Sequence, residues 1–96
     1  MYRHGDLLII KVDSIPDNAK VKEDNILAYG TATGHSHRLS GGMVLEEGQS
    51  VYLKVPNSGV LTHEEHDDIT LSPGEYRVIR QVEYNPYEKA TRMVMD

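Results

Sequence analysis

The sequence of 96 residues contains no cysteine. Disulfide bridges and thiolate metal ligands are therefore excluded, and with them a closed structural zinc site of the finger type. Long apolar runs are also missing: residues 7–10 are far too few to cross a bilayer, and the charged residues 1–6 do not resemble a signal peptide. We therefore expect a cytoplasmic protein without a membrane partner.

An excess of basic residues is likewise absent, since 15 acidic residues stand against 10 basic ones and the formal net charge is −5. This charge gives no general attraction to nucleic acid, so binding of nucleic acid would require a local basic patch. Apolar residues make up 39% of the chain and are grouped in strand-sized runs. The length and grouping indicate one domain over residues 1–96, and no repeat divides it.

Short runs of branched and aromatic residues alternate with Gly, Pro, Asn and Asp, which favour turns. No stretch shows the periodicity of an amphipathic helix. The pattern predicts an all-β fold, a small antiparallel β-barrel or sandwich of about seven or eight short strands. The expected strands lie within residues 6–12, 26–34, 35–40, 43–45, 50–55, 60–62, 68–71 and 76–84. We expect an exposed connection over residues 13–25 and a short last strand within residues 87–96.

Two histidines stand two positions apart in Gly34-His35-Ser36-His37-Arg38. If this segment is extended, both imidazoles leave the same face of a strand. Gly30 and Gly34 predict a bulge or a close backbone approach beside the pair, with room for a ligand. A second pair, His63 and His66, follows in Leu61-Thr62-His63-Glu64-Glu65-His66-Asp67. We expect the two segments to meet at one site.

Neutral imidazole is the commonest metal ligand at neutral pH, and two imidazoles on one strand face can chelate one ion. We expect a divalent metal ion (Zn, Mn, Ni or Fe) in an open site with a bound water. Its candidate ligands are His35, His37, His63 and His66. A further ligand could come from the neighbouring carboxylates, although these also fit a solvated acidic turn. Each histidine also fits an ordinary surface or hydrogen-bonded residue. For His4 we favour a flexible N-terminal lead-in, and the alternative is that the first strand carries it to the same end of the domain.

The two histidine segments, followed by Leu71-Ser72-Pro73-Gly74-Glu75-Tyr76-Arg77-Val78 and Gln81-Val82-Glu83-Tyr84, resemble a family of small uncharacterised proteins from bacteria, phages and archaeal viruses. The resemblance covers most of the chain and implies that these segments act together. The chain is also loosely similar to the cupins, through a glycine followed by the His-x-His pair. The match to the cupins is partial, because no glutamate follows His37 within four residues and the second histidine pair precedes Pro73-Gly74.

Three classes of function remain open from the sequence. The first is a metal-dependent phosphoesterase acting on nucleotide or RNA, with Arg38 and Arg80 binding the substrate phosphate. In this class, the metal ion would lower the pKa of a bound water, and Glu64 or Glu65 would handle the protons. The second is a metal-independent nuclease in which His35, His37 or His66 act as acid and base. The third is a non-catalytic oligomeric binding module, and a homodimer is expected because a small β domain has edge strands to protect.

Overall fold

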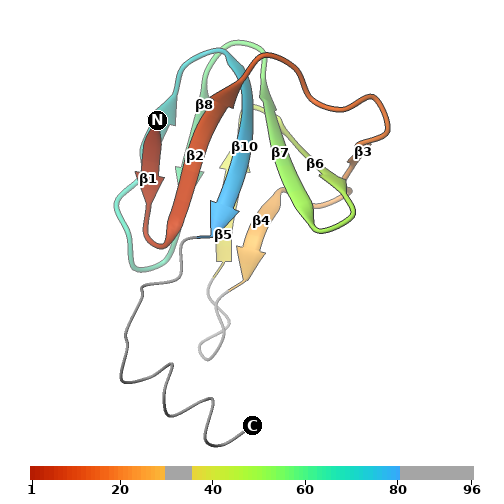
Figure 1. Cartoon of the computed structure of the whole chain (residues 1–96). Helices are drawn as coiled ribbons and strands as arrows, with labels where there is room; N and C mark the ends of the chain where they lie inside the picture. The colour runs from red at the N-terminus through yellow and green to blue at the C-terminus, as the bar shows by residue number, and fades with distance from the viewer. Residues whose placement is uncertain (30–35, 81–96) are drawn as a thin grey trace, which may run out of the picture.

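A computed structural model of the chain describes residues 1–29 and 36–80. These ranges contain ten short strands and no helix, arranged as two antiparallel sheets packed against each other (Figure 1). The sheets do not close into a barrel. Of the two predicted architectures, the all-β sandwich is therefore the observed one. Within residues 1–29 and 36–80, no helix is long and apolar enough to cross a membrane.

The larger sheet has six strands, and the smaller sheet has four. In spatial order, the six-stranded sheet contains β1 (Tyr2–His4), β2 (Leu7–Val12), β10 (Gly74–Arg80), β7 (Ser50–Val55), β6 (Met43–Glu47) and β3 (Lys20–Val21). The four-stranded sheet contains β4 (Ile26–Tyr29), β5 (Ser36–Ser40), β8 (Gly59–Thr62) and β9 (Ile69–Leu71). Every pairing between neighbouring strands is antiparallel.

The apolar core lies between the two sheets, because alternate residues of each strand face inward. The six-stranded sheet contributes Leu7, Ile9, Val44, Leu53, Val55 and Tyr76, and the four-stranded sheet contributes Leu27, Leu39, Leu61 and Leu71. Both sheets thus supply fully buried leucines, as a two-layer sandwich requires. Two histidines, His4 and His37, are also buried, with 2% and 3% of their surface exposed. These two side chains mark the polar end of the core.

Two short strands were not predicted. Residues 2–4, expected as a flexible lead-in, form β1 and pair with β2, so the prediction for His4 was wrong. The connection over residues 13–25 contains β3, which pairs with β6. A register shift between β4 and β5 lies at Ile26 and Ala28. The bulge predicted at Gly30 and Gly34, His35, and the last strand predicted within residues 87–96 lie outside the described residues.

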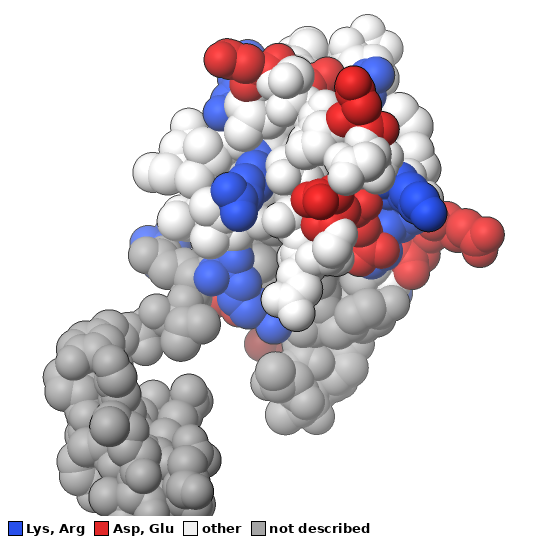
Figure 2. Space-filling model, turned by 45° about the vertical axis from the view of Figure 1, so that its right-hand side comes forward, with Lys and Arg blue, Asp and Glu red and all other residues white. Residues whose placement is uncertain are grey.

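Charged side chains of both signs cover the surface. On the face shown in Figure 2, Lys and Arg alternate with Asp and Glu over the described residues, without a continuous area of one sign. This mixture agrees with the small net charge of −5. A broad electrostatic track for a polyanion is therefore not a feature of this face.

Candidate metal centre

Four histidines gather at one end of the sandwich: His4, His37, His63 and His66. His37 faces inward because it lies two residues from the core residue Leu39 on the same strand. His63 follows Leu61 by two residues, and His66 lies in the connection that leads to β9. Figure 1 shows this connection running beside the turn between β1 and β2. The prediction that the two histidine segments meet is therefore confirmed for His37, His63 and His66.

His4 reaches the cluster because β1 is tied to both neighbouring parts of the fold. The Gly5-Asp6 turn brings β1 back onto β2, with His4 opposite Leu7. The hydroxyl of Tyr2 accepts a hydrogen bond from the backbone N–H of Ser72 at 3.3 Å, and its ring meets the Tyr76 ring edge to face. These contacts hold the inward side chains of β1 against the core, so His4 is fixed in place.

The four rings are as close together as ligands of one ion. Their centroids are separated by distances from 4.4 Å, for His37 and His63, to 6.3 Å, for His4 and His63. For two imidazoles bound to one zinc at about 2.0–2.1 Å from each nitrogen, ring centres lie roughly 5 Å apart. Among residues 1–29 and 36–80, however, no three ligating side chains already share a metal position.

The closest contact joins His4 Nδ1 to His37 Nδ1 at 2.9 Å, inside the protein. His4 Nε2 lies 3.0 Å from the carbonyl oxygen of Asp67, which can only accept, so this nitrogen carries the proton. A neutral His4 therefore presents a lone pair on Nδ1 toward His37. His37 must then donate from its own Nδ1.

A proton on Nδ1 of His37 is unfavourable for the contact that His37 makes with Asp6. His37 Nε2 lies 3.4 Å from Asp6 Oδ1, and Arg80 Nε lies 3.2 Å from the other oxygen of the same carboxylate. If Nδ1 of a neutral His37 carries the proton, its Nε2 lone pair faces a carboxylate oxygen. If Nε2 donates to Asp6 instead, two Nδ1 lone pairs face each other. A cation between the two Nδ1 atoms would allow both neutral rings to donate at their outer nitrogens.

Burial keeps both rings neutral. Removal from water, together with the neighbouring His63 and His4, lowers the pKa of His37 to about 4, although the Asp6 carboxylate acts in the opposite direction. Burial also lowers the pKa of His4, although its hydrogen bond to Asp67 acts in the opposite direction. Neutral imidazole is the form that binds metal, because the charged ring has no lone pair to donate.

His63 and His66 cover this pair from the side of the β8–β9 connection. His63 Nδ1 accepts the backbone N–H of Glu65 at 3.0 Å, so the lone pair of a neutral His63 is already used. The exposed His66 has no such constraint and packs on Gly5. A methyl group built on Gly5 would lie 2.6 Å from His66 Nε2 and 3.2 Å from His37 Cε1. These two rings therefore converge over Gly5.

Gly5→Ala is expected to destabilise the protein by more than Gly48→Ala. Both glycines have a positive φ, 61° at Gly5 and 60° at Gly48, so alanine carries a similar backbone strain of roughly 1–2 kcal/mol at each. Only at Gly5 does the added Cβ meet another group within 4 Å, the His66 ring. Melting temperatures of the two variants measure the difference. Equal losses would show that His66 does not pack on Gly5.

The remaining predicted site residues lie apart from the centre or beside it. Arg38 projects from the opposite face of β5 to His37, because the two are adjacent on one strand. Glu64 accepts the backbone N–H of Ser36 at 3.1 Å, and Glu65 is exposed. Arg80 contacts the centre through Asp6. His35 lies outside the described residues.

Asp6 was missed in the sequence, and for His4 the less favoured alternative, a strand that carries it to this site, is the one observed. The available signal was the Gly5-Asp6 pair, because a two-residue turn that begins with glycine is typical of a β-hairpin. Such a hairpin would have placed residues 2–4 against the first core strand. Nothing in the sequence indicates that the Asp6 carboxylate reaches both His37 and Arg80, since these contacts join segments far apart in the chain.

Comparison with known proteins identifies a family but no activity. No curated protein and no solved structure matches the chain. One family model, described as a domain of unknown function (DUF8820), matches residues 3–81. The match includes all four clustered histidines and Asp6. The chain therefore belongs to the family of the domain of unknown function DUF8820.

Proposed function

We propose that this domain binds a transition-metal ion through His4, His37 and His66. The observation that carries the proposal is the 2.9 Å contact between His4 Nδ1 and His37 Nδ1, each ring having an acceptor at its outer nitrogen. A metal ion between the two Nδ1 atoms allows His4 to donate to the Asp67 carbonyl and His37 to donate to the Asp6 carboxylate. This arrangement, in which a ligating histidine donates its other N–H to an oxygen, is usual in metal sites.

Metal binding requires a small opening of the cluster. Two nitrogens on one tetrahedral zinc lie about 3.3 Å apart, so the His4 and His37 rings must separate by a few tenths of an ångström. His66 supplies the third nitrogen from the solvent side, where its exposed ring can turn. Three protein ligands leave one coordination position for water. Nitrogen ligands suit Zn, Ni and Fe better than Mn, which prefers carboxylate oxygens.

A metal titration tests the proposal. We expect one equivalent of zinc per chain after dialysis, with a stabilisation that grows with free zinc because the ion binds the folded state. In Asp6→Ala, the affinity is expected to fall roughly 10- to 100-fold, since His37 loses the carboxylate that orients it. Isothermal titration calorimetry of both proteins measures the ratio. The matched control is Asp17→Ala, in the connection between β2 and β3, for which we expect the wild-type affinity.

The reaction that we propose for this centre is hydrolysis of a phosphoester. A bound divalent ion would lower the pKa of its water and so supply a nucleophilic hydroxide near neutral pH. Its positive charge would also stabilise the negative charge on the phosphoryl oxygens. Arg80 is the cation beside the centre, whereas Arg38 lies on the outer face of β5. The net charge of −5 gives no general attraction to a long RNA, so a nucleotide is the favoured substrate. Turnover of a chromogenic phosphodiester that stops in chelator would support hydrolysis at the metal. Cleavage of RNA that continues in chelator would support a metal-independent nuclease instead.

A further inference from the structure

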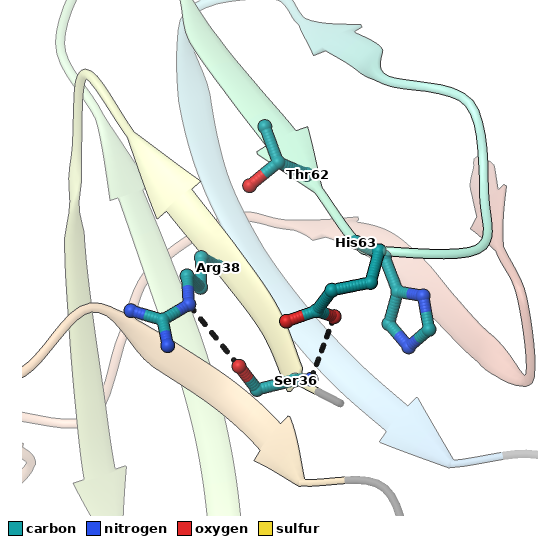
Figure 3. A pocket seen from close by; sticks show the side chains of 5 residues that line it. Ser36, Arg38, Thr62 and His63 are labelled. Carbon is teal, nitrogen blue, oxygen red and sulfur yellow. Dashed lines mark hydrogen bonds between the residues drawn. The ribbon is translucent and has the colours of Figure 1, made fainter. Parts of the chain in front are cut away.

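A hollow of about 250 Å³ lies on the four-stranded sheet, away from the buried pair His4 and His37. Figure 3 shows it with the side chains that line it. These are Ser36 and Arg38 from β5, Thr62 from β8, and His63 and Glu64 just beyond β8. The hollow is smaller than the cavities that bind drug-sized molecules, so only a small molecule fits it.

Strand geometry places the hollow on the outer face of this sheet. Arg38 pairs with Thr62 across β5 and β8, so their side chains stand next to each other on one face. His37 and Leu39 alternate with Arg38 and point into the sandwich. Arg38 thus belongs to a site of its own, which shares only His63 with the histidine cluster.

Two hydrogen bonds hold the charged groups of the hollow in position. Arg38 Nε donates to the hydroxyl of Ser36 at 3.1 Å, which fixes the plane of the guanidinium. The backbone N–H of Ser36 donates to Glu64 Oε2 at 3.1 Å, which fixes the carboxylate. Ser36 itself is 2% exposed and forms the floor between them (Figure 3). A guanidinium and a carboxylate are thereby held on the two sides of one buried serine.

Opposite charges in one hollow select against a ligand with a single charge. A simple anion would be attracted by Arg38 but repelled by Glu64. A simple cation would be attracted by Glu64 but repelled by Arg38. A guanidinium whose Nε is already used still presents its two terminal nitrogens, which can bind a carboxylate. The Glu64 carboxylate is suited to an ammonium group.

We propose that this hollow binds a small zwitterion of the amino-acid type, with its carboxylate on Arg38 and its ammonium group on Glu64. The hydroxyl of Thr62 lies beside Arg38 and can donate to the same carboxylate. The proposal does not depend on metal in the histidine centre, because neither Arg38 nor Glu64 is among the proposed ligands. It gives the domain a second site with a chemistry different from phosphoester hydrolysis.

Amide chemical shifts of the ¹⁵N-labelled full chain test this proposal in the presence of chelator. The probes are glycine and γ-aminobutyrate, which separate the two charges by different lengths, with acetate and methylammonium as single-charge controls. At least one zwitterion is expected to shift the Ser36 and Thr62 amides and to bind at least about tenfold more tightly than acetate or methylammonium. Binding that is equal for acetate, or absent for both zwitterions, would overturn the proposal.

Charge-neutral variants identify the side chains responsible. Arg38→Gln is expected to weaken zwitterion binding at least about tenfold, and Glu64→Gln to weaken it similarly. The matched control is Arg77→Gln, an exposed position on β10 in the other sheet, for which we expect affinity within about twofold of the wild type. His4→Ala removes a proposed metal ligand and should leave zwitterion binding unchanged. Equal binding by Arg38→Gln and the wild type would overturn the assignment even if the metal centre is present.

Discussion

Replacing His4 by alanine is expected to abolish stoichiometric zinc binding, with a loss of affinity of more than about 100-fold. His4 is one of the two buried histidines, and its Nδ1 is directed at His37 by the hydrogen bond from Nε2 to the Asp67 carbonyl. Water can fill the vacated coordination position, but it is a weaker ligand than an imidazole whose orientation is set by the fold. Equilibrium dialysis followed by metal analysis measures the bound zinc per chain.

The matched control for His4→Ala is His63→Ala. Its ring lies 4.4 Å from that of His37, centroid to centroid, but its Nδ1 already accepts the Glu65 N–H. We expect this variant to retain one equivalent of zinc with affinity within about tenfold of the wild type. Circular dichroism of both variants establishes that the sandwich is intact. Wild-type zinc affinity in a folded His4→Ala protein would contradict the assignment of His4 as a ligand.

The metal-free protein is expected to lose stability as the pH falls from about 6.5 to about 4. Because burial and the neighbouring histidines lower the pKa of His37 to about 4, the folded state keeps this ring neutral while the unfolded state binds a proton near the ordinary pKa of 6.5. The unfolded state thus holds more protons in this window, and stability rises with pH. The contribution of the neutral His37 to the free energy of unfolding is fully present above about pH 6.5. Its upper limit is ~3 kcal/mol.

Urea unfolding in chelator at several pH values measures this dependence. His37→Gln preserves a side chain of similar size without a titrating ring, so its stability should vary less with pH over the same window. His4 acts in the same direction, since burial lowers its pKa as well, and the variant therefore keeps part of the slope. Identical slopes for His37→Gln and the wild type would show that His37 does not exchange its proton on unfolding.

The strand pattern of this chain could be predicted because its determinants are local. Residues 50–55 alternate between apolar and polar character and form β7 with these bounds. Ser72 and Pro73 precede β10, whose Tyr76 is buried as the alternation requires. β1 and β3 have only three and two residues. Such short strands depend on their partner strands, so their own sequences carry little signal.

The candidate site was only partly predictable. Two-residue spacing from Leu39 indicates correctly that His37 faces inward, where 3% of its surface is exposed. The same rule places Arg38 on the opposite face of β5. The prediction that Arg38 binds a phosphate beside the histidines did not take this alternation into account. The contacts of Asp6 with His37 and Arg80 depend on how three strands pack, and no local pattern encodes them.

The most direct test of the metal centre is the X-ray absorption spectrum of the zinc-loaded wild-type protein beside that of zinc-treated His4→Ala. The account predicts a first shell that contains about three imidazole nitrogens at about 2.0–2.1 Å in the wild type, and loss of this imidazole signal in the variant. A first shell made of oxygen alone, or an imidazole signal of equal size in His4→Ala, would contradict it.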